Sequence, residues 1–470
     1  MTGQPDAALP PRPLLCLESR LALLLGVLLG IPAVVLVPPV VTYDGPNHYL
    51  RALQVSEGHL RAERFSERAV GGTLPNSHID FLNSILRNYY WGSGADFMDR
   101  RQWEAISRQE ERVPGERRVE FTNTAIYSPA NYAFQALGMR LAGSLSPSPL
   151  LANWTGCLFN LAGYLLLVVL AIECAPHYRR GILLLSSSPL LLVQAASLSA
   201  DAVNYALPLL VLAWAWRLCV REVAHPAREI AGVFALGLLV ALLKPTLVAV
   251  LPCLLLIPAR RLGISGLAKA AGLCAYFLVA SGIWYAWNRV NLDVDVGRWY
   301  DPARAALAAK KLWFHEHPLG FASPFLSVLT HDLADQWPHF YGDPGDWISR
   351  GAYRLNAALS IVFIVGFLGC ASWIGAPRRA WAAGMLAMAF VQIFLTALAL
   401  WLAFGSVGMP VVPRFVGRYL FVPILGLGMA WAEMFHGGYP RARSLAFWAA
   451  LAANAAGLAA IVAPLALRTW

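Results

Sequence analysis

The sequence of 470 residues is 58% hydrophobic and only 14% charged, with a mean hydropathy of +0.53. A soluble protein of this length needs more polar side chains than this to cover its surface. The composition therefore excludes a soluble protein and predicts an integral membrane protein. The formal charge of +10 does not indicate a nucleic-acid partner, because the basic residues form short clusters between apolar runs. That distribution is typical of topology signals.

Charge-poor apolar runs divide the chain when they are compared with the length needed to cross a bilayer. The first run, Leu21 to Val40, is long enough to span and is not followed by a small-residue cleavage pattern, which favours a spanning helix over a signal peptide. We therefore predict one all-α polytopic domain over 1–470 with about eleven transmembrane helices. The predicted spans are 21–41, 150–173, 182–198, 201–217, 229–243, 246–259, 268–288, 353–375, 381–404, 415–434 and 445–467.

The charge of the connections predicts the orientation of these helices. With a cytoplasmic N-terminus, every short inward connection is basic, as the positive-inside rule requires. Two long loops, 42–149 and 289–352, then lie outside the cytoplasm and hold 20 of the 27 acidic residues. The basic inward positions are His177, Arg179, Arg180, Arg217, Arg221, Arg228, Arg260, Arg261, Lys269, Arg378, Arg379, Arg441 and Arg443.

The first long loop contains two stretches with helical spacing of apolar groups, Pro46 to Leu60 and Tyr132 to Leu145. We expect both to be helices that lie along the membrane surface. None of the seven cysteines falls in either long loop, which argues against disulfides and against a zinc site.

The segment from Tyr43 to Arg51 begins where the first span leaves the membrane. If a helix starts at Gly45 or Pro46, His48 and Arg51 lie one turn apart on one face, with Asp44 at its entry. A carboxylate, an imidazole and a guanidinium could meet there. Equally, Asp44 before Gly-Pro could be an ordinary helix N-cap.

Two other places put a charge next to an apolar run. Asp201 follows Ser199-Ala200 between two spans, where it could either cap the next helix or face a polar site. Lys244-Pro245 interrupts an apolar run of about 30 residues, so it marks a hairpin or a broken helix. The lysine could snorkel or meet a lipid phosphate.

Positive charge also occurs on the outer side, at Pro413 to Tyr419, against the topology rule. Arg414 and Arg418 could bind an anionic partner, because the planar guanidinium matches phosphate oxygens. Alternatively, they could snorkel or pair with an acidic loop residue.

Several short motifs resemble, in order, the bacterial membrane proteins called domain of unknown function 2142. These proteins look like relatives of the family C (GT-C) membrane glycosyltransferases, and the resemblance covers residues from about 21 to 425. The motifs are Asp44-Gly-Pro-Asn-His48 with Arg51-Ala52 and Glu57-Gly58, then Tyr127-Ser-Pro-Ala-Asn-Tyr132, Ser199-Ala-Asp201, Lys244-Pro-Thr246 and Gly417-Arg-Tyr419.

The resemblance implies a transferase in the bacterial cytoplasmic membrane that moves a sugar from a polyprenyl-phosphate carrier to a glycan, lipid or protein hydroxyl on the outer face. Asp44 is the expected base, with inversion at the sugar, and His48 would orient Asp44 or the acceptor. No cofactor is expected, and dependence on a divalent metal stays open. The expected substrate or lipid-phosphate residues are Arg51, Tyr127, Tyr132, Asp201, Lys244, Arg414, Arg418 and Tyr419.

Two other classes of function remain. A transporter or flippase of polyprenyl-linked sugars would also be polytopic, but its ionisable residues commonly lie near the midplane, whereas the residues named here lie at helix ends. A non-catalytic protein of envelope-polysaccharide assembly is the third possibility. Transfer activity of the membrane-embedded protein separates the enzyme from both.

Overall fold

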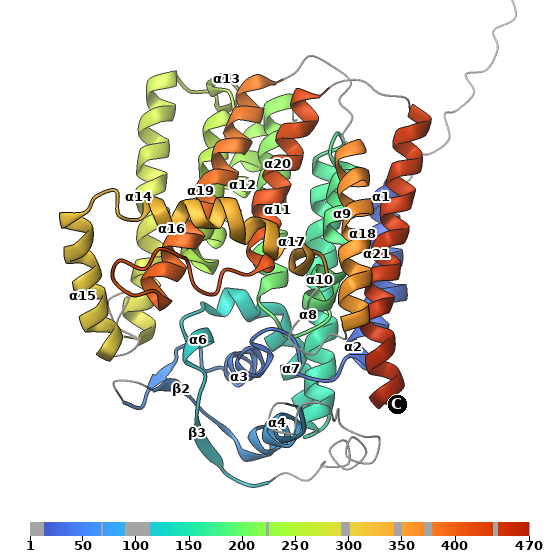
Figure 1. The fold of residues 1–470 in the computed structure, drawn as a ribbon, viewed down its shortest axis with the longest axis vertical. Helices are drawn as coiled ribbons and strands as arrows, with labels where there is room; N and C mark the ends of the chain where they lie inside the picture. Colours follow the sequence, from blue (N-terminus) through green and yellow to red (C-terminus); the bar gives the residue numbers. More distant parts are fainter. Residues whose placement is uncertain are drawn as a thin grey trace, which may run out of the picture.

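The computed structural model describes residues 14–66, 69–89, 113–221, 225–292, 301–342, 350–370, 378–435 and 440–469. The chain is mostly helical, and its long helices run side by side in a bundle (Figure 1). Smaller helices and a short sheet cover one end of the bundle. This arrangement confirms the predicted polytopic helical architecture.

Within the described residues, eight helices are long and apolar enough to cross a membrane. The first is continuous through a π-helical turn, and its pieces are α1 (Leu17–Leu25), η1 (Gly26–Gly30) and α2 (Ile31–Leu36). The others are α8 (Pro149–Cys174), α11 (Asp201–Val220), α12 (Pro226–Leu243), α14 (Gly266–Leu292), α18 (Arg350–Gly369), α19 (Arg379–Phe404) and α21 (Pro440–Thr469).

Three of the eleven predicted spans are shorter or broken. The span 182–198 consists of α9 (Arg179–Ser186) and α10 (Pro189–Ala195), because Pro189 cannot continue the first helix. The span 246–259 is the 3-10 helix η3 (Pro245–Leu256), and 415–434 is η5 (Gly417–Leu420) followed by α20 (Phe421–Met434). The prediction of about eleven spans therefore exceeds the number that helix length supports.

The two ends of the bundle differ in charge. We call the end that carries α13 (Ala259–Leu262) the basic end; it lies at the top in Figure 1. Arginines begin α9 and α19 there, and Arg217 lies in the last turn of α11. The opposite end, which we call the loop end, carries α3 (Gly45–Ser56), α4 (Asn76–Tyr89) and the sheet.

The two helices predicted in the first long loop are present as α3 and α7 (Ala133–Leu145). However, α3 does not lie free on a surface: most of its side chains are buried, including Tyr49 and Arg51. It packs against α7, the short helix α6 (Thr122–Ala125) and the 3-10 turn η2 (Pro129–Tyr132). The interior of the loop is thus built around α3.

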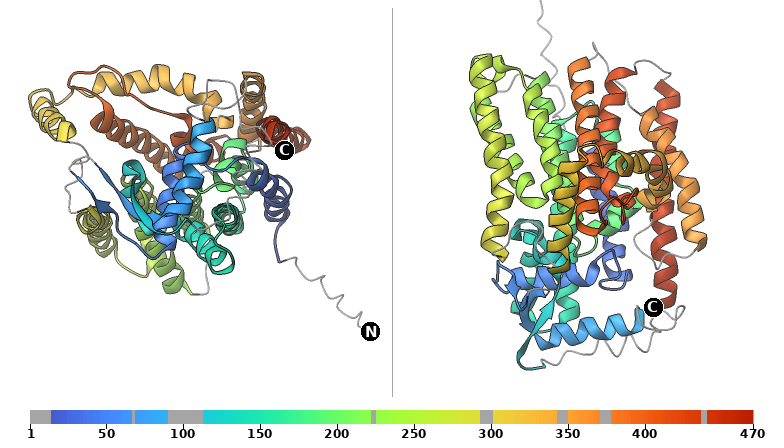
Figure 2. Two further views of the ribbon diagram at one scale, coloured as in Figure 1. Left: turned by 90° about the horizontal axis from the view of Figure 1, so that it is seen from below. Right: turned by 60° about the vertical axis from the view of Figure 1, so that its left-hand side comes forward.

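The loop end also contains a short three-stranded antiparallel sheet, which the prediction of a helical chain did not include. Its strands are β1 (Glu63–Arg64), β2 (Val70–Pro75) and β3 (Glu116–Glu120), with Gly72 opposite Val119. The sequence signal was weak because β2 contains two glycines and a proline, and β3 is mostly charged. The right-hand view of Figure 2 shows α4 lying across the lower end of the bundle, beside the sheet.

The second long loop supplies another set of short helices. They are α15 (Asp301–Glu316), α16 (Ala322–Ser327), the π-helical turn η4 (Val328–Asp332) and α17 (Leu333–Gly342). In Figure 1 the stretch from α16 to α17 runs across the long helices, and α17 contacts η5 and α18. These contacts hold the segment around Gly417 in place.

Candidate functional site

Asp44 lies at the start of α3 in a left-handed backbone conformation, with φ of 55°. It occupies the N-cap position, but its side chain makes no capping hydrogen bond, so the capping alternative is wrong. Instead, Asn123 Nδ2 donates to Oδ1 over 3.0 Å, and Arg418 Nη2 donates to Oδ2 over 2.6 Å. Aspartate and asparagine tolerate this backbone region better than most other residues, which explains the residue type at this position.

Four charged side chains from distant parts of the chain form an alternating series, which we call the ion chain. Arg418 binds Asp44 with one nitrogen, and its Nη1 lies 3.6 Å from Asp201 Oδ2. Lys244 Nζ donates to the other oxygen of Asp201 over 2.6 Å. The structure therefore brings together the acidic and basic residues of four separate sequence motifs.

Asp201 and Lys244 meet because two helices end at the same level. Asp201 is the first residue of α11, its cap position is Ala200, and Ser199 Oγ accepts from the Asp201 N–H over 3.1 Å, so the predicted capping role of Asp201 is also wrong. Lys244 follows the last residue of α12 in an extended conformation, and Pro245 starts η3, which packs back on α12. This is the predicted interruption, in the form of a hairpin.

Arg418 is held by its neighbours on both sides. Its guanidinium lies 4.9 Å from the ring centre of Tyr43 and 5.5 Å from that of Tyr419. Gly417 lets η5 approach α17 closely, because a Cβ there would lie 2.3 Å from the backbone nitrogen of Phe340. Within the described residues, Arg418 Nε and Nη1 are buried without a hydrogen-bond partner, and Nη1 has only the ion pair of 3.6 Å with Asp201, so the guanidinium keeps donor hydrogens that an anion could accept.

His48 lies one turn into α3 and is buried next to two tyrosines. Its Nδ1 shares a hydrogen bond of 2.7 Å with the Tyr132 hydroxyl, and its ring stacks on Tyr127 at 6.4 Å. Burial lowers the pKa of His48 to about 4, although Asp201 and Asp44 act in the opposite direction. The imidazole is therefore neutral at physiological pH.

The ion chain sets the charge states of its members. Burial by itself would raise the pKa of Asp44, but Arg418 outweighs this and holds that pKa below its usual value. Burial would likewise lower the pKa of Lys244, yet Asp201 raises it above the ordinary value. Asp44, with 39% of its side chain exposed, is thus a solvent-accessible carboxylate beside the fixed cation of Arg418.

Two of the three predicted site arginines do not join the ion chain. Arg51 is fully buried and donates to the carbonyl oxygens of Leu60 and Tyr127, over 2.8 and 2.9 Å, and to Gln54. It therefore fixes the turn that carries Tyr127. Arg414 lies with its guanidinium 4.6 Å from the ring centre of Phe404 and has no ion pair with Asp44 or Asp201.

Sequence reasoning missed the amides that support the carboxylates. Asn204 Nδ2 lies 3.4 Å from Asp201 Oδ1, and Asn131 Nδ2 donates to Asn204 Oδ1 over 2.9 Å. Asn204 could have been found, because it follows Asp201 by one helical turn on the same face. No local pattern links Asn123 to Asp44, since they are 79 residues apart.

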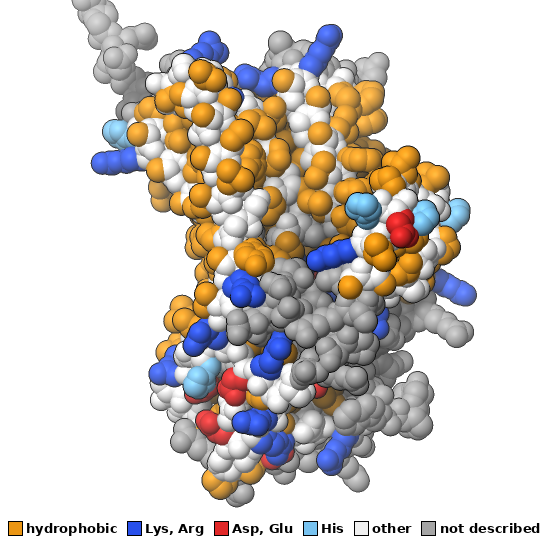
Figure 3. Space-filling model, turned by 90° about the vertical axis from the view of Figure 1, so that its left-hand side faces the viewer, with side chains coloured by type: hydrophobic (Ala, Val, Ile, Leu, Met, Phe, Trp, Pro, Cys, Tyr) orange, Lys and Arg blue, Asp and Glu red, His pale blue; other side chains and the backbone are white. Residues whose placement is uncertain are grey.

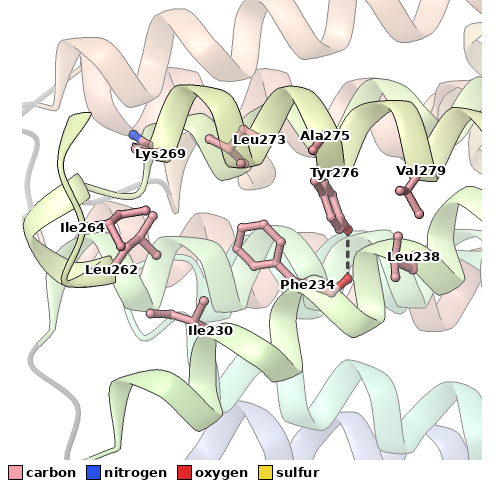
Figure 4. Close-up of a pocket in the computed structure, with 11 residues that line it drawn as sticks. Ile230, Phe234, Leu238, Leu262, Ile264, Lys269, Leu273, Ala275, Tyr276 and Val279 are labelled. Atoms are coloured by element: carbon pink, nitrogen blue, oxygen red, sulfur yellow. Dashed lines mark hydrogen bonds between the residues drawn. The ribbon is translucent and has the colours of Figure 1, made fainter. Parts of the chain in front are cut away.

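Among the described residues, the ion chain does not belong to a metal site. No group of three or more His, Cys, Asp or Glu side chains with a metal-binding arrangement occurs within the part of the chain that the structure describes. A groove is present elsewhere, between α12 and α14 at the basic end. It is lined almost entirely by apolar side chains (Figure 4).

The fold and the ion chain define the class: a polytopic helical membrane protein with a charged cluster where several helices end. The family described as "Predicted membrane protein (DUF2142)" matches residues 27–429, and the chain belongs to this family. The match includes every member of the ion chain. No curated protein and no solved structure matches the chain.

Proposed function

We propose that the protein is a membrane glycosyltransferase of GT-C type that moves a sugar from a polyprenyl-phosphate carrier to a hydroxyl of a glycan, lipid or protein. The observation that carries this proposal is the contact between the accessible carboxylate of Asp44 and the buried guanidinium of Arg418. A base and a phosphate-binding cation side by side are the two groups that this reaction needs.

In the proposed reaction the acceptor hydroxyl attacks the anomeric carbon of the donor sugar. Asp44 takes the hydroxyl proton, the new C–O bond forms, and the bond from carbon to the phosphate oxygen breaks. The lipid phosphate leaves with the electron pair, from the face opposite the attack, so the configuration inverts. Arg418 and Lys244 would stabilise the charge that develops on the phosphate.

The pairing of Asp44 with Arg418 suggests how the site would respond to its donor. Arg418 lowers the pKa of Asp44, which makes the carboxylate a weaker base while the pair is intact. A phosphate that draws Arg418 to itself would release Asp44 and raise its basicity. The buried nitrogens of Arg418 that lack a hydrogen-bond partner among the described residues support this exchange.

The other residues would position the reactants. Neutral His48 and Tyr132 lie beside Tyr127, whose ring is 5.4 Å from Lys244 Nζ. Such aromatic groups next to cations suit a sugar attached to a phosphate. Arg414, which lies outside the ion chain, could contact the lipid side of the carrier phosphate.

We propose a topology of about eleven crossings with a cytoplasmic N-terminus in the bacterial cytoplasmic membrane. The broken helix α9–α10, the 3-10 helix η3 and α20 would add three crossings to the eight long helices. The direction of the chain then alternates through the bundle, and the arginine-rich basic end faces the cytoplasm, as the positive-inside rule requires. The ion chain would be reached from the outer leaflet.

Two glycines provide a matched test of this orientation. A Cβ added at Gly143, at the loop end, or at Gly266, at the basic end, meets no atom within 4 Å. Each is replaced by cysteine in a chain where Cys16 and Cys274 are alanine, and intact cells are treated with a membrane-impermeant thiol reagent. The proposal expects labelling at position 143 and none at 266 before lysis; the reverse pattern would overturn it.

A transporter or flippase is the main alternative. Transporters commonly place their ionisable residues near the bilayer midplane. Here Asp201 begins α11 and Lys244 follows the end of α12, so the ion chain lies at helix ends. This placement supports the enzyme over the transporter.

The direct test is Asp44→Asn, with sugar transfer measured in membranes from a panel of polyprenyl-phosphate sugars. Asparagine also tolerates the left-handed backbone, so the variant removes the charge without adding strain. We expect transfer to fall by about 10²–10⁴-fold, the range for loss of a general base. Asp80→Asn is the matched control, because Asp80 is an acidic residue of the same loop that pairs with Arg117.

The outcomes separate the candidate functions. Full activity of Asp44→Asn would refute the role of Asp44 as base. No transfer by the unmodified protein from any donor, with correct insertion, would argue for the transporter or for a non-catalytic assembly protein. Movement of the intact lipid-linked sugar across vesicles would then favour the transporter.

A further inference from the structure

The groove between α12 and α14 contains no member of the ion chain and has no part in the proposed reaction. It has a volume of about 410 Å³, within the range of about 300–1,000 Å³ that ligand pockets occupy. Figure 4 shows side chains from both helices and from the α13 turn pointing into it. Its walls include Phe234, Leu238, Leu262, Leu273, Tyr276 and Val279.

The walls of the groove offer an apolar surface. The polar atom of Tyr276, its hydroxyl, donates to the carbonyl oxygen of Phe234 over 2.8 Å, as the dashed line in Figure 4 marks. A ligand in the groove would therefore contact apolar side chains along most of the length of the groove. Burying apolar surface there is favourable at about 25 cal/mol per Å².

One end of the groove is cationic. Lys269 lines it and uses one hydrogen on the carbonyl oxygen of Leu255 over 2.5 Å, so two of its three donor hydrogens remain for a ligand. Arg260 and Arg261 lie in the adjoining helix α13. The groove thus suits an amphiphile with an apolar tail and an anionic head.

The groove also lies on a face of the bundle that lipid tails would contact. Of the eight candidate spans, the one in α14 has the smallest buried share, 11%. Leu278 and Val279 of this helix are exposed. Figure 3 shows this face: its upper part is largely apolar, with Lys and Arg side chains at its top edge.

We propose that the groove binds one anionic glycerophospholipid of the leaflet next to the basic end. An acyl chain would occupy the apolar channel, and the phosphate would accept hydrogen bonds from Lys269. Basic pockets between transmembrane helices on the cytoplasmic side are typical sites for anionic lipid headgroups. The cationic rim favours an anionic phospholipid over a neutral one, and the apolar channel favours a lipid over a free phosphate.

The test is native mass spectrometry of the full chain in detergent, titrated with phosphatidylglycerol and with phosphatidylcholine. We expect phosphatidylglycerol to bind more tightly, and Lys269→Gln to weaken it about tenfold, as expected when a charge-assisted hydrogen bond is lost. Ala275→Phe, which fills the groove, should remove the tight site. Arg441→Gln and Cys274→Phe are the matched controls, since neither residue lines the groove.

Other results would overturn the proposal. These are equal binding of both lipids, or unchanged affinity of both variants for phosphatidylglycerol. If polyprenyl phosphate displaced phosphatidylglycerol and Ala275→Phe abolished its binding, the occupant would be the carrier instead. Inorganic phosphate should not compete; competition would show that the site recognises the phosphate alone.

Discussion

Arg418 and Asp44 are 374 residues apart in the sequence, yet Arg418 Nη2 donates to Asp44 Oδ2 over 2.6 Å. The contact joins the start of α3 to the turn η5 before α20. Because Arg418 also lies next to Asp201, this arginine links the first long loop to the helix ends of the bundle. The proposed reaction uses both members of this contact.

Replacing Arg418 should change the pH dependence of transfer. Arg418 lowers the pKa of Asp44, so Arg418→Gln should raise that pKa, and the fraction of ionised Asp44 should fall at a higher pH than in the unmodified protein. We expect the acidic limb of the pH–rate profile to move upward by about 1–3 units, the usual effect of one close opposite charge. Arg414→Gln is the control and should leave the limb in place. An unmoved limb in Arg418→Gln would show that Asp44 does not control the rate.

The pair of Asp201 and Lys244 should be strongly coupled in stability. Removing Asp201 leaves Lys244 without its acidic partner, whereas removing Lys244 leaves Asp201 with Arg418 as its remaining cation. Breaking a buried ion pair typically costs about 3–5 kcal/mol, so we expect the loss of Asp201 to cost more than the loss of Lys244. We expect Asp201→Asn and Lys244→Met each to lower the free energy of unfolding in mixed micelles, and the double variant to lose less than the sum of the two. If the double variant instead loses the sum of the two single losses in unfolding free energy, the ion pair, whose atoms lie 2.6 Å apart, contributes no interaction energy of its own.

Two buried histidines should make the loop end sensitive to acid. His48 shares a hydrogen bond with the Tyr132 hydroxyl and His78 shares one with the Tyr49 hydroxyl, and burial lowers both pKa values to about 4. The unfolded chain binds these protons near pH 6.5, so their contribution to stability is complete above that pH. It is lost as the pH falls from 6.5 toward 4, by up to about 1.4 kcal/mol per pH unit for each histidine.

The measurement for these histidines is the thermal unfolding temperature between pH 4 and pH 8. We expect His48→Gln to lower the stability at pH 8 and to flatten its fall between pH 6.5 and 4. The double variant His48→Gln/His78→Gln should show a flatter fall still. If the unfolding temperature of both variants falls as steeply with pH as that of the unmodified protein, other groups cause the acid sensitivity.

Gly417 should control the position of Arg418. A Cβ at residue 417 would lie 2.3 Å from the backbone nitrogen of Phe340, and backbone cannot move away as a flexible side chain can. We expect Gly417→Ala to shift η5, to reduce transfer and to destabilise the fold by about 1–3 kcal/mol, as overpacking does. Gly143→Ala, which meets open space in a helix, should be neutral or slightly stabilising.

Arg51 should act through structure and not through the substrate. Its Nη2 donates to the carbonyl oxygens of Leu60 and Tyr127 while its Nη1 donates to Gln54, and a lysine, which has one nitrogen, cannot place donors at both of these positions. We expect Arg51→Lys to lower the unfolding free energy by about 1.5–3 kcal/mol, the usual value for hydrogen bonds to charged groups. An increase in KM for the donor with unchanged stability would instead place Arg51 in the binding site.

The sequence predicted the membrane class and most of the long helices, because hydropathy and helix length depend only on local composition. It also predicted α3, α7 and the interruption at Lys244, each from a local pattern of apolar residues and proline. It missed β2 and β3, whose glycines and charges give no strand signal until the two strands pair. Only eight of the predicted spans are long continuous helices within the described residues, and Pro189 and Pro245 each begin a short helix inside a predicted or neighbouring apolar run.

The sequence by itself also selected Asp44, Asp201, Lys244 and Arg418 as unusual, since each charge stands beside an apolar run. It left open whether the two aspartates cap helices, and only the tertiary structure decided that neither does. Pairing between residues 374 positions apart depends on the packing of η5, α3 and α11, which no local pattern encodes. Local sequence patterns determined which charged residues stand next to apolar runs. The packing of distant segments determined which of those charged side chains form ion pairs.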